Sequence, residues 1–141
     1  MKRAIGWTLV VAMAAGALWA ATAWPRLNDV ETGRTPEYPD LQVRTYEAGV
    51  ETVSKAVQEA LSGLPRWTVV GSGTGPEGAF VSAVHETIVF RFEDDVTVRI
   101  RRSGGRTTLS ARSHSRVGDW DFGQNARNLR ELLTAVDARL R

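Results

Sequence analysis

The stretch that decides the fold is residues 112–128, which read RSHSRVGDWDFGQNARN. It holds three arginines, two aspartates, two asparagines, two serines and a histidine, with two glycines that let the chain bend. Before it, apolar residues alternate as in a strand; after it, they recur every three or four residues as in a helix. The stretch therefore predicts a strand-to-helix connection crowded with hydrogen-bonding groups, and it matches no catalytic motif.

The segment before this connection predicts an antiparallel sheet. In residues 96–102, Val96, Val98 and Ile100 face one side, and a Gly-Gly turn leads into a return strand that ends at Arg112. Two earlier strands are predicted at residues 66–72 and 79–92, the second of which could be divided by a break at residues 86–87. Residues 93–95, Glu-Asp-Asp, are then predicted to be a turn.

Two amphipathic helices complete the predicted domain. Apolar residues recur at steps of three and four in residues 47–64 and again in residues 122–140. Thr45 is the expected N-cap of the first helix, and Asp119 or Asp121 that of the second. The fold class is therefore α+β, a two-layer domain of helix, about four antiparallel strands and helix over residues 46–141.

Residues 1–24 predict a transmembrane helix. Lys2 and Arg3 precede 21 uncharged residues, which as a helix would span roughly 30 Å, the thickness of a bilayer core. The charges favour a cytoplasmic N-terminus, so a single-pass protein of the inner membrane with its domain in the periplasm is expected. Alternatively, residues 21–23, Ala-Thr-Ala, fit a signal-peptide cleavage site, after which the domain would be secreted to the periplasm.

Residues 25–45 contain three prolines and show no periodicity. A Pro-rich linker that lifts the domain off the membrane is the favoured interpretation. The alternative is a strap that packs on the domain through Leu41, Val43 and Tyr46.

The composition excludes several functions. The absence of cysteine excludes disulfides, thiolate catalysis and lipoprotein acylation, and two histidines leave little for a metal site, so neither metal nor cofactor is expected. Residues 24–95 carry 6 basic and 12 acidic side chains, and residues 96–141 carry 10 and 4. The two halves can neutralise each other, so no nucleic-acid partner is implied.

Three features of the predicted sheet can be explained without assigning them a function: a glycine-rich segment, a row of arginines and His85. The glycine-rich residues 71–78 lie between strands and lack the Gly-Lys-Ser/Thr ending of a P-loop, which favours a hairpin connection. Arg99, Arg101 and Arg112 share the polar face of the last two strands. This face is either solvated and neutralised by the acidic half or an anion-binding site. His85 lies among apolar residues, which favours a structural role.

Three motifs resemble those of the family known as domain of unknown function 1499. They are Arg112-Ser113-x-Ser115-Arg116-Val117-Gly118-x-x-Asp121-x-Gly123-x-Asn125, Phe92-x-Asp94-Asp95-Val96-x-Val98-Arg99 and Asn28-Asp29-Val30-x-Thr32. The resemblance covers roughly residues 27–140. It implies that the Asp-Asp pair and the Arg-Ser/Ser-Arg segment meet in space, and it carries no established activity. His114 stands where the family has a small residue, which argues against a catalytic role for it.

No catalytic or metal-ligating residue is assigned. The candidate binding site consists of Asp94, Asp95, Arg99, Arg112, Ser113, Ser115, Arg116, Asp121 and Asn125. The favoured function is a membrane-tethered accessory domain that binds an anionic ligand or a protein partner through the arginines. A structural domain, in which the same groups form a fold-locking ion-pair network, is the first alternative. An Asp-dependent hydrolase or transferase is the second.

Overall fold

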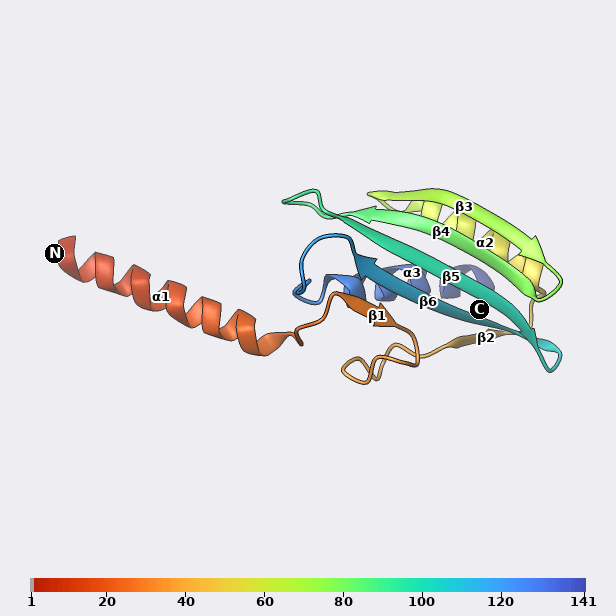
Figure 1. Cartoon of the computed structure of the whole chain (residues 1–141), viewed down its shortest axis with the longest axis horizontal. Helices are drawn as coiled ribbons and strands as arrows, with labels where there is room; N and C mark the ends of the chain where they lie inside the picture. The colour runs from red at the N-terminus through yellow and green to blue at the C-terminus, as the bar shows by residue number, and fades with distance from the viewer. Residues whose placement is uncertain (1) are drawn as a thin grey trace.

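The computed structural model describes residues 2–141, with side chains from residue 6 onward (Figure 1). Its elements, in chain order, are α1 (Lys2–Ala23), β1 (Asp29–Glu31), β2 (Arg44–Tyr46), α2 (Val50–Gly63), β3 (Trp67–Gly75), β4 (Gly78–Glu86), β5 (Glu93–Ser103), β6 (Arg106–Ser115) and α3 (Gln124–Leu140). The strands form one antiparallel sheet in the order β1-β6-β5-β4-β3, and β2 pairs with a second part of the β6 edge.

Helices α2 and α3 pack on one face of this sheet, so the predicted two-layer α+β fold is confirmed (Figure 1). The alternation in the last two long strands places their apolar residues against the helices. Val96, Val98, Ile100, Leu109 and Ala111 are all at most 2% exposed. Within the described residues the sheet has six strands rather than about four, because β1 and β2 come from the segment before α2.

Residues 25–45 lie against the domain, which agrees with the strap interpretation and differs from a free tether. Leu41 and Tyr46 are buried, whereas Val43 is 43% exposed. Between β1 and β2, Thr32 replaces a strand partner: its amide donates to the Ala111 carbonyl (2.9 Å), and its hydroxyl accepts from the Ala111 amide (3.0 Å). These bonds satisfy the β6 edge where no regular strand covers it.

Helix α2 begins at Val50, later than predicted. Thr45 is not its cap, because this residue belongs to β2 and pairs with Thr108. Gly49 occupies the N-cap position without a side-chain hydrogen bond. The strand pairing of residues 44–46 therefore delays the start of the helix.

Both central strands extend further than the sequence pattern predicted. Residues 93–95 are not a turn, because they form the first part of β5, and β6 continues past Arg112 to Ser115. The predicted strand over residues 79–92 instead ends at Glu86, and residues 87–92 connect β4 to β5. These extensions add polar residues to the helix-covered face at one end of the sheet.

Helix α1 projects from this same end of the domain (Figure 1). Residues Gly6–Ala23 have a mean hydropathy of 1.5, and none of this span is buried in the domain. The helix is long and apolar enough to cross a membrane or to serve as a signal sequence.

Candidate functional site

A row of buried polar side chains crosses the sheet near α1. His85 of β4 pairs in register with Asp94 of β5, which pairs with Ser115 of β6. All three face the helices, and none is more than 7% exposed. The His85 Nδ1 atom lies 3.8 Å from the Asp94 carboxylate, and the His85 ring packs on that of Trp67, with centroids 5.0 Å apart. The structure thus places the candidate Asp94 inside the domain.

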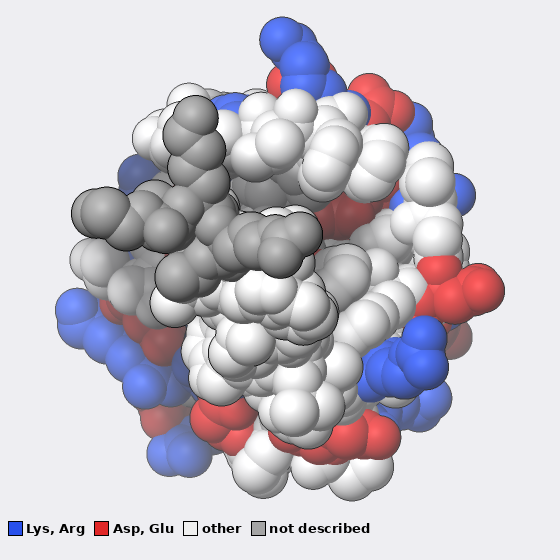
Figure 2. Space-filling model, turned by 90° about the vertical axis from the view of Figure 1, so that its left-hand side faces the viewer, with Lys and Arg blue, Asp and Glu red and all other residues white. Residues whose placement is uncertain are grey.

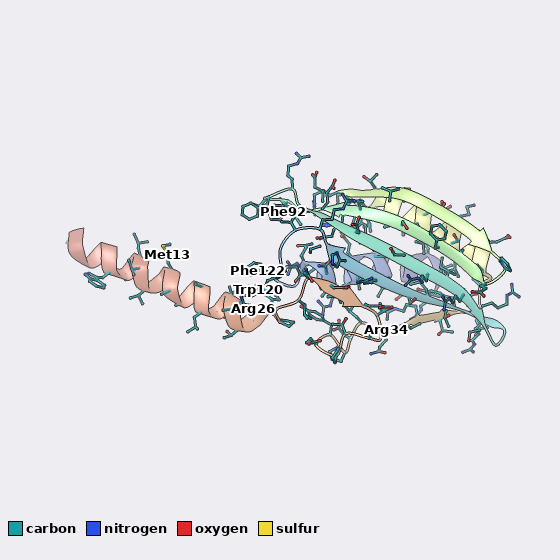
Figure 3. The ribbon with its side chains drawn as sticks, viewed as in Figure 1. Met13, Arg26, Arg34, Phe92, Trp120 and Phe122 are labelled. Atoms are coloured by element: carbon teal, nitrogen blue, oxygen red, sulfur yellow. The ribbon has the colours of Figure 1, made fainter. Side chains whose placement is uncertain are left out.

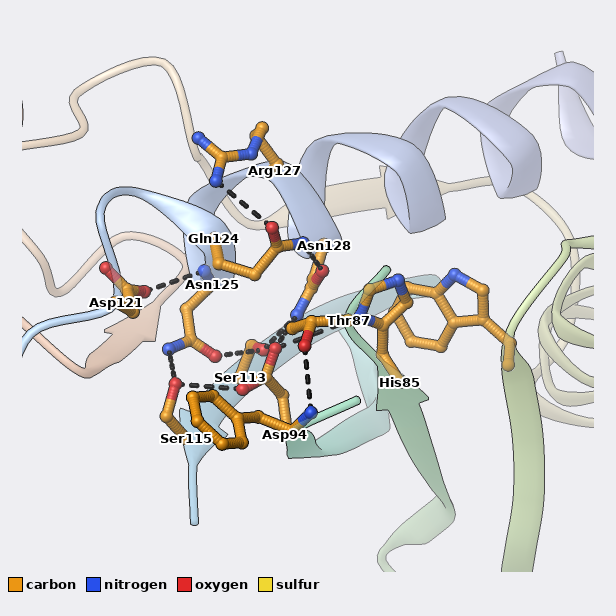
Figure 4. Close-up of polar contacts among 12 residues, drawn as sticks. His85, Thr87, Asp94, Ser113, Ser115, Asp121, Gln124, Asn125, Arg127 and Asn128 are labelled. Atoms are coloured by element: carbon orange, nitrogen blue, oxygen red, sulfur yellow. Dashed lines mark hydrogen bonds and ion pairs between the residues drawn. The ribbon is translucent and has the colours of Figure 1, made fainter. Parts of the chain in front are cut away.

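Hydrogen bonds join this row to the start of α3 (Figure 4). The Ser115 hydroxyl donates to Asp94 Oδ1 (2.8 Å) and accepts from Asn125 Nδ2 (2.8 Å). The Ser113 hydroxyl donates to Asn125 Oδ1 (2.5 Å). Asn128, one helical turn further along α3, donates to Asp94 Oδ2 (2.8 Å) and to the Ser113 oxygen (3.2 Å). Each of these five side chains bonds at least two others, so they act as one unit, named here the buried polar network.

The entry into α3 depends on Asp121. Its carboxylate accepts from the Gly123 amide (2.8 Å) and from the Asn125 amide (2.7 Å). The side chain predicted as a cap thus satisfies the first amides of the helix, although Gly123 holds the N-cap position with a φ of 76°. This geometry turns Asn125 towards the sheet.

Asn28, immediately before β1, adds the third motif to the site. Its carbonyl accepts from the Asn125 side chain (3.0 Å) and from the Ser115 amide (2.8 Å). Its own side chain donates to the Gly118 carbonyl (2.7 Å). The resemblance implied that the Asp-Asp pair and the Arg-Ser/Ser-Arg segment meet; the structure brings the third motif to the same place.

The arginines of the candidate site lie outside the buried polar network. Arg112 forms a bidentate pair with Asp29, with Nε 2.8 Å from Oδ1, and Arg116 pairs with Asp95 (Nη2 to Oδ1, 2.7 Å) and with Glu93. The hydrogen bonds from the guanidinium groups hold the pKa values of Asp29 and Asp95 below the usual range for aspartate. These pairs link the acidic and basic halves of the chain.

Acid should weaken these ties. The folded-state pKa of Asp29 lies below its unfolded value, so its contribution is complete above about pH 4 and is lost as the pH falls through the folded pKa. We expect Arg112→Gln to flatten the decline in stability between pH 5 and pH 3 by less than about 1 kcal/mol, since the pair is partly exposed. Urea unfolding of the full chain in detergent micelles at several pH values measures this.

Arg99→Gln is the matched control for the acid experiment. Arg99 is exposed on the outer face of the sheet, and its guanidinium group has no hydrogen bond or ion pair within the described part of the chain. An equal flattening in both variants would mean that net charge, and not the pair with Asp29, sets the acid slope.

A pocket of about 420 Å³ lies beside the network, between the β4–β5 loop and the loop before α3. Its walls are mainly apolar, and its polar lining includes Asp94, Ser115 and Asp121. The lining residues are Thr87, Ile88, Val89, Phe90, Phe92, Asp94, Ser115, Val117, Gly118, Trp120, Asp121, Phe122 and Gln124. Figure 3 shows Phe92, Trp120 and Phe122 at the end of the domain where α1 joins it. No arginine is among these lining residues.

The structure separates the nine predicted site residues into three groups. Asp94, Ser113, Ser115 and Asn125 form the buried polar network, with Asp121 orienting it. Asp95, Arg112 and Arg116 form surface ion pairs, and Arg99 lies apart on the outer face. Among the residues that the structure describes, no three His, Asp or Glu side chains form a group that could hold a metal ion.

Sequence reasoning missed His85 as a neighbour of Asp94, Asn128 as a network member and the apolar pocket lining. Asn128 carried a usable signal, because it lies three residues after Asn125 and so shares its helix face. His85 carried a weaker signal, since its alternation with Ala83 and Val81 predicts a buried side chain but no partner.

Comparisons with known proteins give a distant structural likeness and a family. The crystal structure of TTHA0849 from Thermus thermophilus matches with 12% sequence identity and a TM-score of 0.37, covering 79% of this chain and 95% of that one. A search of curated proteins found no match. The model of the family described as "Protein of unknown function (DUF1499)" matches residues 20–136, which include all three motifs and the whole buried polar network. The chain therefore belongs to the DUF1499 family.

Proposed function

We propose that this protein is a membrane-tethered, extracytoplasmic binding domain that takes an apolar or amphipathic molecule into the pocket beside the buried polar network. The observation that carries the proposal is the pocket itself, an apolar cavity of about 420 Å³ with polar groups at one side. Small-molecule sites have this size and this mixture of apolar walls and few polar groups.

The proposed tether is supported by α1 and by the two positive charges in its first turn. Lys2 and Arg3 favour a cytoplasmic N-terminus, which places the domain on the opposite side of the membrane. Cleavage after residues 21–23 would release the same domain into the same compartment. We propose the inner membrane of a bacterium, facing the periplasm, as its location.

The polar lining narrows the class of ligand. The pocket is lined by two aspartates, Asp94 and Asp121. Of the arginines expected to hold an anion, Arg112 and Arg116 are paired with surface carboxylates, and Arg99 lies on the outer face of the sheet, away from the pocket. Carboxylates accept hydrogen bonds and repel negative charge. A chain-like apolar molecule with a hydroxyl, amide or ammonium group therefore fits the pocket better than an anionic one.

The fold-locking alternative explains the surface arginines well. Arg116 ties the end of β6 to β5, and Arg112 ties β1 to β6. These ties are compatible with binding, because they fix the strands that carry the polar groups of the pocket. The enzymatic alternative has less support. The hydroxyl of Ser115 contacts the Asp94 carboxylate but is held on its other side by Asn125, which restricts it as a nucleophile.

A photo-crosslinking experiment tests the binding proposal. The full chain in lipid nanodiscs is exposed to a neutral monoacylglycerol with a diazirine in its acyl chain. We expect saturable cross-links in residues 115–124, competed by the unlabelled lipid. Val117→Trp, which narrows the pocket, should reduce them about fivefold, since a loss of about 1 kcal/mol in binding free energy lowers affinity about fivefold.

Val70→Trp is the matched control. Val70 is 62% exposed, compared with 56% for Val117, but it lies on β3 and outside the pocket. Cross-links that do not saturate, or that fall equally in both variants, would contradict a specific pocket. Near-ultraviolet circular dichroism confirms that each variant is folded.

A further inference from the structure

Exposed apolar side chains gather at the end of the domain from which α1 leaves. Three consecutive residues of the β4–β5 loop, Ile88, Val89 and Phe90, are 73%, 78% and 73% exposed. The set, named here the apolar rim, consists of Ile88, Val89, Phe90, Phe92, Val117 and Phe122. Outside α1, the other exposed large apolar residues in the described chain are Val43, Val70 and Phe80, which lie elsewhere. A concentrated patch of this kind marks an interaction surface.

The fold holds the β4–β5 loop in an outward position. The Thr87 amide donates to the Phe92 carbonyl (2.8 Å), and the Thr87 hydroxyl accepts from the Phe92 amide (2.9 Å). These bonds close a four-residue loop, so residues 88–91 project beyond the end of the sheet. The rings of Phe90 and Phe92 stack with centroids 5.4 Å apart. The loop therefore presents apolar groups to the outside in a fixed form and does not fold them into the core.

The second part of the apolar rim lies where the chain leaves α1. Trp24 packs so closely on Gly123 that a Cβ atom there would lie 2.5 Å from its ring. The Arg26 guanidinium lies over the Trp120 ring, 5.1 Å from the centroid, and Trp120 stacks on Phe122. These contacts fix the end of α1 beside the pocket.

The figures place the β4–β5 loop and the labelled Phe92 and Phe122 at the end of the domain from which α1 leaves (Figures 1 and 3). In Figure 1 the tip of the β4–β5 loop lies level with the last turns of α1 along the long axis of the molecule. Figure 2 looks at this end of the molecule; uncharged residues surround α1, and charged ones lie mostly towards the outline. A bilayer spanned by α1 would meet this face first.

We infer that the apolar rim inserts into the bilayer that α1 spans, on the side where the domain lies, so that the pocket opens towards lipid. The inference rests on the proposed membrane tether but not on any ligand in the pocket. The aromatic rings and aliphatic side chains of the apolar rim are of the types that favour the membrane interface. Arg26 lies at the same end (Figure 3), a position from which a cationic side chain reaches lipid phosphates. Arg91 of the β4–β5 loop pairs with Glu86 (3.0 Å).

Spin labels test this surface, because the chain contains no cysteine and accepts a single one at any chosen site. Three variants of the full chain, Phe90→Cys, Gly16→Cys and Ser103→Cys, carry a nitroxide in liposomes. Collision with oxygen, which concentrates in lipid, is compared with collision with a water-soluble nickel chelate. We expect the oxygen-to-nickel ratio at residues 90 and 16 to exceed that at residue 103, the last residue of β5 at the distant end of the sheet, by about threefold or more.

The three sites separate the possible failures. A low ratio at residue 16 would overturn the tether, whereas a high ratio at residue 16 with a low one at residue 90 would overturn the inserted rim alone. A label at residue 90 shielded from both reagents would overturn insertion in favour of a protein partner.

A charge placed in the apolar rim gives a second measurement. With the label at Val89→Cys, Phe92→Asp should lower the ratio to that of residue 103, because a carboxylate resists burial in lipid. Phe80→Asp, at a residue of nearly equal exposure (47% against 46%) on the outer face of the sheet, should leave it unchanged. Equal ratios in the two variants would overturn the inference.

Discussion

Replacing Asp94 by alanine is expected to lower the free energy of unfolding of the domain by about 3 kcal/mol, because each buried donor that loses its acceptor costs about 1–3 kcal/mol. Two donors depend on this carboxylate: the Ser115 hydroxyl and the Asn128 side-chain amide. Asp94 itself is 1% exposed, so its removal leaves both donors inside the domain. Relief of the buried charge and water entering from the adjacent pocket offset part of the loss.

Asp95→Ala is the matched control for this prediction. Asp95 is the next residue on β5, but it faces outward, is about half exposed and pairs with Arg116. Exposed ion pairs contribute at most about 1 kcal/mol, so this variant should unfold at nearly the original denaturant concentration. Urea unfolding of the full chain in detergent micelles, followed by near-ultraviolet circular dichroism, compares the two. Equal losses would show that the buried polar network does not hold the domain together.

The contrast between Asp94 and Asp95 also shows what the sequence could and could not predict. Side-chain alternation correctly predicted the apolar face of β5 from Val96 onward. Continued backwards by one step it would have placed Asp94 inward, but a buried carboxylate is unusual, and the Glu-Asp-Asp run favoured a turn. The strand extends because Ser115, Asn125 and Asn128 supply partners, and these lie far away in sequence.

The side-chain pattern of the sequence also could not predict the two short strands, β1 and β2. β1 and β2 have three residues each, too few to show a periodicity, and they are separated by a proline-containing segment. Their stability comes from pairing with β6, a contact across more than sixty residues of sequence. The opposite error occurred at residues 87–92, where an apolar run predicted strand although its side chains are exposed at the end of the domain.

The sequence indicated which of its motifs lie close together better than it indicated how their side chains pair. The resemblance correctly implied that the Asp-Asp pair meets the Arg-Ser/Ser-Arg segment, and Arg116 pairs with Asp95. The division of the site into an inner network and outer ion pairs depends on strand register, which side-chain types alone do not encode. Arg112 pairs with Asp29, which sequence reasoning had placed in a linker.

Gly78→Ala is expected to cost about 3–5 kcal/mol, since backbone strain and the loss of strand hydrogen bonds add together. Gly78 begins β4 with a φ of 141°, a conformation that side-chain-bearing residues rarely adopt. A Cβ atom there would lie 2.0 Å from the carbonyl oxygen of Ile100. The Ile100 side chain is fully buried in the core. The carbonyl oxygen of this central-strand residue therefore cannot move aside without disturbing the core. The substitution should therefore separate the start of β4 from β5.

Gly75→Ala distinguishes this effect from a general need for glycine in residues 71–78, which form the end of β3, the hairpin turn and the start of β4. Gly75 is the cross-strand partner of Gly78 in the β3–β4 hairpin, yet a Cβ atom there would meet nothing within 4 Å. This variant should change the free energy of unfolding by less than about 0.5 kcal/mol, or stabilise slightly, because alanine restricts the unfolded chain. Urea midpoints of the two full-length variants provide the test. A large loss in both would mean that the whole hairpin requires flexible backbone, whereas a loss confined to Gly78→Ala would assign its role to close packing against β5.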